Sequence, residues 1–178
     1  VARLLSKSTG QEKMVARYTN CFRGHTNLNV HAEEVMIEDD VLTSCFEEGD
    51  ELYVYISYHP CHNSGGGRAL TGQKHHTSCT LALCQWADKV LKPLKTKLHV
   101  RCSDIYRAAW TDADKFGPEE DYEAFNSKCE LARQGIRLLQ DHPLITLEMF
   151  DRKDWEFILS LCDTRLRLNA ADVDHRQQ

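Results

Sequence analysis

Four residues in the first half of the chain have the types and the order needed to hold a metal ion and to activate water. His31 and Glu33 lie at the expected start of a helix, Cys61 follows a strand-like run, and a later helical pattern opens with Cys79. One imidazole and two thiolates fit a tetrahedral zinc site whose fourth position stays open for water. Zinc lowers the pKa of such a water to about 7, and a carboxylate that is not a ligand can then carry the proton. The sequence therefore predicts a hydrolytic zinc site with Glu33 as the proton carrier and with His31, Cys61 and Cys79 as ligands.

The second thiolate ligand has two candidates. Cys61 and Cys79 are separated by 17 residues, and Cys79 directly follows Ser78, a residue type that caps helices. The positive end of the helix dipole favours a thiolate at that position. Cys84 would lie one turn further along the same helix. We therefore expect Cys79 to be the ligand, with Cys84 as the alternative.

The residues between the two cysteines, 62–78, form an unusual segment. It contains three consecutive glycines and three histidines, and it is weakly basic. A solvated surface loop is one interpretation, and a lid or substrate-contacting loop over the metal is the other, because both ends would be tethered at the metal. Ligation by His62, His75 or His76 is a third possibility.

The elements that must position these residues follow from hydrophobic periodicity. Strands are predicted at 14–21, 52–58, 98–106 and 144–150. Helices are predicted at 30–36, from Ser78 to Pro93, over 122–139 and from about Asp154 to Leu166. Strands that alternate with helices favour parallel pairing, while the two early strands fit an antiparallel hairpin on the same sheet. The sequence therefore predicts an α/β fold with a mixed sheet covered by helices.

Length, charge and cysteine content narrow the class of protein. A chain of 178 residues fits a single domain spanning 1–178, with its core at about 14–168, and no apolar run approaches the roughly 20 residues of a membrane span. The net charge of −5 predicts that any contact with nucleic acid is local. Two of the eight cysteines would be ligands, and the other six suit up to three disulfides in a secreted protein. Buried free thiols in a cytoplasmic protein are the alternative.

The ordered motifs resemble those of a known enzyme class. His31-Ala32-Glu33 followed by Pro60-Cys61 is similar to the H-x-E and P-C-x-x-C signature of zinc deaminases. With the strand that ends at Cys61 and the order of elements over about 14–168, the chain resembles the AID/APOBEC polynucleotide cytidine deaminases, and most closely their secreted novel AID/APOBEC-like branch. The departure is the 17-residue separation of the cysteines, which are only a few residues apart in that family.

The resemblance carries several expectations. It implies a cytidine deaminase-like three-layer fold with a five-stranded mixed sheet, and zinc-dependent conversion of cytosine to uracil in single-stranded DNA or RNA. Tyr58 and Tyr106 would flank the base, although both could equally be core residues, and Asn27, or alternatively Asn29, would contact the sugar. Two other functions stay open, namely deamination of free cytidine or deoxycytidine, and a catalytically silent secreted zinc-binding protein.

Overall fold

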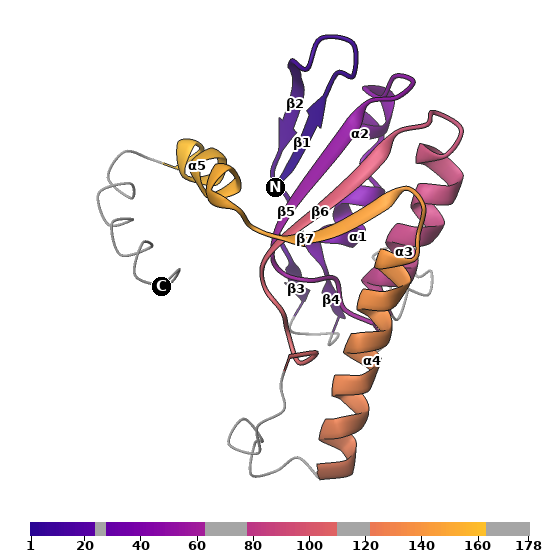
Figure 1. Ribbon diagram of the computed structural model, residues 1–178, viewed down its shortest axis with the longest axis vertical. Coiled ribbons are helices and arrows are strands. Elements are labelled where there is room, and N and C mark those ends of the chain that lie inside the picture. The colour runs from indigo at the N-terminus through magenta and orange to yellow at the C-terminus, as the bar shows by residue number, and fades with distance from the viewer. Residues whose placement is uncertain (24–27, 63–77, 110–121, 163–178) are drawn as a thin grey trace.

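A mixed five-stranded sheet forms the centre of the molecule (Figure 1). The computed structural model describes residues 1–23, 28–62, 78–109 and 122–162. The sheet order is β2-β1-β5-β6-β7, with bounds Glu12–Ala16, Ala2–Leu5, Glu51–Tyr58, Lys97–Asp104 and Ile145–Met149. β1 runs antiparallel to both of its neighbours, whereas β5, β6 and β7 are parallel. A short separate ribbon pairs β3 (Cys21–Arg23) with β4 (Leu28–Val30).

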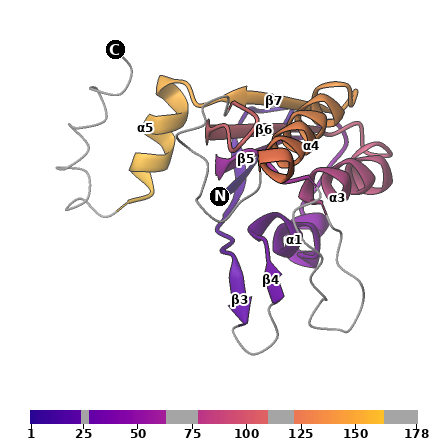
Figure 2. The same cartoon turned by 90° about the horizontal axis from the view of Figure 1, so that it is seen from below.

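Helices cover both faces of the sheet, so the fold is a three-layer α/β arrangement (Figure 2). Successive side chains of a strand point to opposite faces. Val54 of β5 belongs to the main apolar core, which also contains Leu83 of α3. The next residue, Tyr55, contacts Phe157 of α5 on the opposite face, with ring centroids 5.0 Å apart.

The helices differ greatly in length. Their bounds are α1 Ala32–Ile37, α2 Asp40–Ser44, α3 Cys79–Trp86, α4 Tyr122–Gln140 and α5 Arg152–Ser160. α3 continues into a π-helical turn, η1 (Ala87–Leu91), and the two together connect β5 to β6. α4 connects β6 to β7. These two crossovers place the parallel strands side by side, so that the C-terminal ends of β5 and β6 lie at the same edge of the sheet.

Most of the predicted elements are confirmed. The strands predicted at 52–58, 98–106 and 144–150 correspond to β5, β6 and β7, and the four predicted helices correspond to α1, α3, α4 and α5. The predicted strand at 14–21 is divided, because β2 ends at Ala16 and β3 begins at Cys21. The predicted hairpin of the two early strands is wrong. β1, which has only four residues and too short a pattern to read, lies between β2 and β5.

No disulfide joins any two of the seven cysteines whose side chains the structure describes. These are Cys45, Cys61, Cys79, Cys84, Cys102, Cys129 and Cys162. The predicted disulfides are therefore not formed among these seven. Apart from the candidate ligand Cys79, two of them, Cys102 and Cys129, are buried. None of the helices in the described ranges is both long and apolar enough to cross a bilayer.

Candidate metal centre

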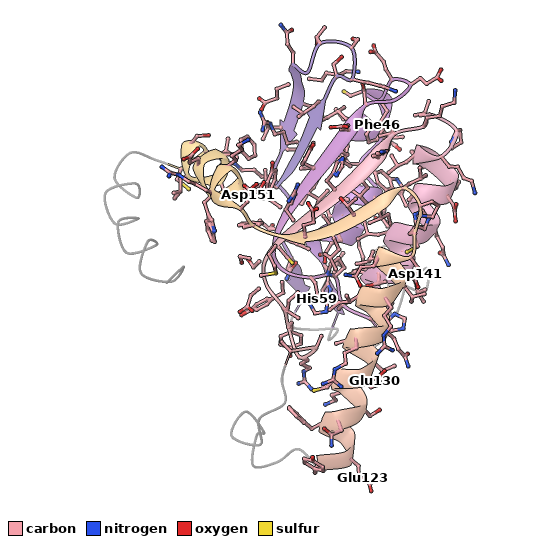
Figure 3. All side chains as sticks on the ribbon, in the orientation of Figure 1. Phe46, His59, Glu123, Glu130, Asp141 and Asp151 are labelled. Atoms are coloured by element: carbon pink, nitrogen blue, oxygen red, sulfur yellow. The ribbon has the colours of Figure 1, made fainter. Side chains whose placement is uncertain are left out.

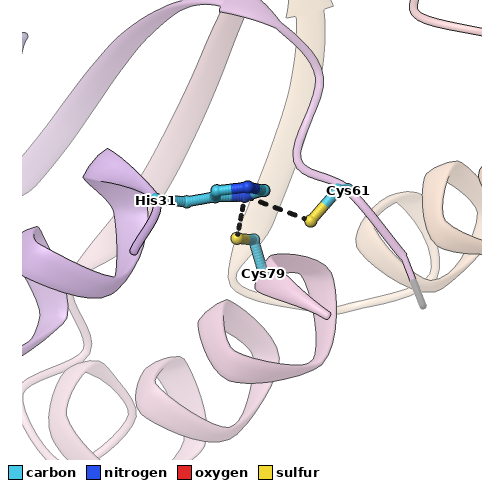
Figure 4. A group of neighbouring side chains, drawn as sticks. All are labelled: His31, Cys61 and Cys79. Carbon is cyan, nitrogen blue, oxygen red and sulfur yellow. Dashed lines mark hydrogen bonds between the residues drawn. The ribbon is translucent and has the colours of Figure 1, made fainter. Parts of the chain in front are cut away.

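Three side chains from distant parts of the sequence meet at the edge of the sheet where β5 ends (Figure 4). The Nδ1 atom of His31 lies 3.2 Å from the sulfur of Cys79 and 3.4 Å from the sulfur of Cys61. The three ligand atoms all lie within 4.8 Å of one another. One nitrogen and two sulfurs at these separations can bind a single metal ion, and this donor set is typical of zinc.

His31 is fixed by the start of α1. It is the N-cap residue, with extended backbone angles (φ −78°, ψ 153°), so its side chain leaves the helix at the end and not along the side. Its backbone N–H donates to the carboxylate of Glu34 at 2.8 Å, and the N–H of Ala32 donates to Asn20 Oδ1 at 2.8 Å. Glu34 is almost fully buried. It therefore orients the imidazole of the candidate ligand, a role not predicted from the sequence although a glutamate three residues after an N-cap is a known helix-start signal.

Hydrogen bonds join Cys61 to the start of α3. The carbonyl oxygen of Cys61 accepts from the Thr80 N–H at 3.0 Å and from the Ser78 hydroxyl at 3.3 Å. The Thr80 hydroxyl donates to the carbonyl of Pro60 at 3.1 Å. Ser78 also caps α3, as predicted, by accepting from the N–H of Leu81 at 3.1 Å. These bonds fix both cysteines relative to one another at the base of the long segment between them.

His62 and Ser78 close the gap between the two cysteines. The Nδ1 atom of His62 lies 2.9 Å from the Ser78 hydroxyl oxygen. The two ends of the intervening segment are therefore in contact, and the sulfurs of the two cysteines lie within 4.8 Å of each other despite their separation in the sequence. Residues 63–77 lie outside the described residues, and so the lid and loop interpretations and the roles of His75 and His76 remain predictions.

The choice between Cys79 and Cys84 is clear within the described residues. Cys79 belongs to the three-membered group and is buried. The sulfur of Cys84 instead lies 3.9 Å from the carbonyl oxygen of Leu138 in α4. His62 contacts Ser78 and is not a member of the metal-binding group. The ligand set His31, Cys61 and Cys79 is thus the one that the geometry brings together.

α4 packs closely against this site because it has a glycine at the point of contact. A Cβ atom on Gly135 would lie 2.7 Å from Cβ of His62 and 3.2 Å from Oγ1 of Thr80. Real Cβ atoms do not approach carbon atoms that closely, so a side chain at this position would displace the segment that contains Cys61 and His62. The sequence analysis missed Gly135, since a lone glycine inside a helix pattern does not reveal what lies opposite.

The electrostatic field at the centre favours positive charge. The contact with the Cys61 sulfur raises the pKa of His31 to about 9, against the opposing effect of burial. The same Cys61 sulfur and burial raise the pKa of Cys79, and Glu33 and Glu34 contribute in the same direction. Protons and divalent cations compete for such groups, so a metal ion that binds here would displace protons from them.

Glu33 lies beside the ligands without being one of them in the described group. Burial raises its pKa, while the charge of His31 acts in the opposite direction and that of Cys61 adds to the rise. It is the second residue of α1, and its position so close to the helix start keeps its carboxylate within electrostatic reach of the ligands. Such a carboxylate can accept a proton and return it.

The two predicted aromatic residues are neighbours. Tyr58 ends β5 and Tyr106 follows β6, and their ring centroids lie 5.6 Å apart in an edge-to-face arrangement. Tyr58 is 53% exposed and Tyr106 is 38% exposed, which disfavours the alternative that both are core residues. Their rings contact each other and do not face each other across an open slot. Asn27 lies outside the described residues, and so its predicted sugar contact remains a prediction.

The buried residue next to this pair is His59. Its Nδ1 atom accepts a hydrogen bond from the backbone N–H of Tyr106 at 3.1 Å, and burial lowers its pKa. The sequence analysis passed over His59, because a histidine between a strand and a proline has no distinctive spacing.

No protein-family model matches the chain, and no curated protein matches it either. The functional argument therefore depends on the geometry of the site and on the motifs that the sequence itself contains.

Proposed function

We propose that this protein is a zinc-dependent deaminase that converts cytosine to uracil by hydrolysis. The convergence of His31 Nδ1 with the sulfurs of Cys61 and Cys79 is the observation that carries the proposal. Structural zinc sites are closed by four protein ligands, whereas catalytic sites have three and leave a position for water. Within the described residues, the group has three members, which favours catalysis.

The proposed chemistry assigns one role to the metal and one to Glu33. Bound zinc would supply a water molecule of lowered pKa as the nucleophile. The Glu33 carboxylate would accept a proton from that water, donate it to the ring nitrogen of the cytosine, and assist the departure of ammonia. His31 and Glu33 serve the same reaction because both lie at one helix start, where an N-cap side chain and the first helical turn can face the same point.

The spatial arrangement of the two cysteines supports the family assignment, although their separation in the sequence departs from the family pattern. Pro60-Cys61-His62 and Ser78-Cys79, joined by the His62 to Ser78 contact, reproduce the P-C-x-x-C arrangement of zinc deaminases in space. Together with the mixed five-stranded sheet, this supports membership of the AID/APOBEC-like deaminases. Residues 63–77 are then an insertion within a compact motif.

The exposed aromatic pair favours a nucleobase within a polynucleotide as the substrate. Base stacking on aromatic side chains is the usual way in which single-stranded nucleic acid is held without sequence preference. Tyr58 lies three residues before Cys61 and offers an exposed ring next to Tyr106. We therefore propose single-stranded DNA or RNA as the substrate, with the base held at this pair.

The overall charge favours a second candidate substrate. Phosphate contacts from lysine and arginine supply most of the affinity for a polynucleotide, and the chain carries a net charge of −5. Free cytidine or deoxycytidine requires no such contacts. The same metal centre and the same Glu33 would serve either substrate.

An assay of uracil formation in the strand, or of uridine formation from free cytidine, tests the proposal at low salt. The substrates are a cytosine-containing single-stranded DNA, the matching RNA, and free cytidine, and zinc per chain is measured on every preparation. We expect Glu33→Gln to retain zinc and to lose at least about 100-fold in rate. Glu38→Gln is the matched control, because Glu38 follows the same helix and is exposed, and we expect it to keep full activity.

Each outcome decides between the alternatives. Conversion of an oligonucleotide but not of cytidine supports the polynucleotide substrate, and the reverse supports the nucleoside. Unchanged activity of Glu33→Gln would overturn the assignment of the proton carrier. Zinc at one per chain with no conversion of any cytosine substrate would favour the silent zinc-binding protein.

A further inference from the structure

His59 connects the metal-binding segment to the aromatic pair, at the end of the sheet from which the loop after β6 leaves (Figure 3). It is only 4% exposed and lies between Tyr58 and Pro60. Its backbone N–H donates to the carbonyl of Asp104 at 3.3 Å, which extends the pairing of β5 and β6 by one bond beyond the strands. The residue is therefore fixed by its backbone, and its ring points toward the neighbouring segment.

The imidazole of His59 accepts a hydrogen bond from a backbone N–H that lies beyond the end of β6. The Tyr106 N–H lies two residues beyond the end of β6, and Nδ1 of His59 accepts it at 3.1 Å. Since Nδ1 acts as an acceptor, the ring carries its proton on Nε2. Buried polar groups cost free energy when they lose their partner, so this bond determines where the backbone of Tyr106 can lie.

The turn that contains Tyr106 needs such support. Arg107 has a left-handed backbone conformation with φ of +55°, which a residue with a side chain rarely adopts without help from its surroundings. The guanidinium of Arg133 in α4 donates to the carbonyl of Ala108 at 3.1 Å. His59 on one side and Arg133 on the other thus hold the turn between them, and of the two only His59 is adjacent to Tyr58.

We infer that His59 is a positioning residue that holds Tyr106 against Tyr58 and thereby sets the place of the substrate base relative to Cys61. This inference rests on the proposed function for the identity of the substrate. The positioning itself rests on the His59 hydrogen bond and on the Tyr58 to Tyr106 contact. His59 touches neither the ligand atoms nor, in this proposal, the base.

The variants His59→Asn and His59→Gln distinguish the effect of the hydrogen-bond acceptor from the effect of the volume of the ring. In His59→Asn the amide oxygen can occupy the place of Nδ1 and accept from Tyr106. In His59→Gln the amide lies about where Nε2 was, one bond too far. Both keep a buried polar side chain, and His59→Leu removes the acceptor altogether.

The first measurement needs no activity. Amide hydrogen exchange at Tyr106, followed in the zinc-loaded protein, should stay slow in His59→Asn and become at least about tenfold faster in His59→Gln and His59→Leu. Unchanged exchange in both of the latter variants overturns the positioning role. This result is independent of whether the protein is a deaminase.

The second measurement uses the cytosine substrate that the wild type converts. If Tyr106 is no longer held in place, binding of the ground state and binding of the transition state weaken equally. We therefore expect the KM of His59→Gln to rise about tenfold while its kcat stays within about threefold of the wild type. Both constants of His59→Asn should stay near the wild-type values. Zinc should remain at one per chain in all variants. A loss of zinc, a fall in kcat at unchanged KM, or an equal defect in His59→Asn would overturn the inference.

Discussion

The two ends of strand β5 both bury polar groups, but they do so in opposite ways. The beginning of the strand lies near Phe46 and the end lies near His59, at opposite ends of the sheet (Figure 3). At the beginning, Asp50 is 2% exposed and is surrounded by donors from this chain. Its carboxylate accepts from Lys13 Nζ at 2.8 Å and from the backbone N–H groups of Glu47 and Lys7 at 2.9 and 3.4 Å.

At the end of β5, by contrast, the three candidate ligand atoms converge on one point. His31 contacts the sulfurs of Cys61 and Cys79, and the Cys61 sulfur raises the pKa values of both His31 and Cys79. At the beginning of the strand the positive charge comes from Lys13 within the chain, whereas at the end a cation from solution would supply it. One strand can thus stabilise the fold at one end and carry a candidate metal site at the other.

The comparison predicts that Asp50→Ala has the largest effect on stability. Removal of a buried carboxylate takes away the acceptor of two backbone N–H groups and one of the two acidic partners of Lys13, and we expect the free energy of unfolding to fall by about 3 kcal/mol, with or without zinc. Urea unfolding measures this. Glu47→Ala is the control, because Glu47 contacts the same lysine from a side chain that is 74% exposed, and its loss should cost less than about 1 kcal/mol. If the loss of stability in Asp50→Ala depends on zinc, the two ends of β5 do not act independently, and the comparison is contradicted.

The dependence of the free energy of unfolding on pH should also reveal the contribution of Asp50 at acid pH. Burial alone would raise the pKa of Asp50, but the bonds from Lys13 and from the backbone of Glu47 and Lys7 outweigh it and lower the pKa. A lowered pKa in the folded state means that the contribution is complete above the unfolded value of about 3.9 and is lost as the pH falls through the folded value. We expect the wild type to lose more stability below pH 4 than Asp50→Asn does.

Removal of the metal should have the next largest effect. A cation that binds only the folded protein stabilises it by about 2.7 kcal/mol at a free concentration 100 times its Kd. We expect a chelator to lower the free energy of unfolding of the wild type by about this amount. Cys79→Ser should abolish the difference between zinc and chelator, and Cys84→Ser, outside the group, should preserve it. Equal behaviour of the two serine variants would refute the ligand assignment.

Ser78→Ala should have a moderate effect on both stability and metal binding. It removes the cap of α3 and one of the bonds to the carbonyl of Cys61, and we expect a loss of about 1 kcal/mol in stability together with several-fold weaker zinc binding. Asp39→Ala removes the cap of α2 and the acceptor of the Tyr18 hydroxyl, and it should cost at least as much stability without changing zinc affinity. Competition with a chromophoric chelator measures the affinity.

Deletion of residues 63–77 should have the smallest effect. The deletion joins His62 directly to Ser78, whose side chains are already 2.9 Å apart, and restores a two-residue spacing between the cysteines. We expect one zinc per chain and a change in the free energy of unfolding within about 1 kcal/mol. A variant with the segment replaced by glycine and serine at equal length is the control. Loss of zinc upon deletion, but not upon replacement, would show that the chain length is required.

The sequence predicts the elements and the ligands better than it predicts the contacts that hold them. The apolar run of β5 and the regular stripe of α4 are long enough for their periods to be recognised, and His31, Cys61 and Cys79 have chemistry that limits their possible roles. β1, with four residues, and α2, with five, are too short to produce a period. The same shortness explains why the predicted hairpin placed the wrong strands together.

The supporting residues of the site could not be predicted for a different reason. The contact of His62 with Ser78 and the approach of α4 at Gly135 join segments that are far apart in the sequence, and nothing local in the chain marks them. Glu34 is the exception, because its place three residues after the N-cap His31 follows a helix-start pattern. Local rules thus suffice for the ends of helices, whereas packing between layers requires the structure.

The closure between His62 and Ser78 also has a practical consequence for engineering. Because the side chains of His62 and Ser78 touch, a peptide or small domain with adjacent termini could replace the residues between them without stretching the sheet or the helices. Such a graft would sit within a few residues of both cysteines. An RNA-binding or DNA-binding module inserted at this junction would therefore deliver a chosen sequence to the metal centre.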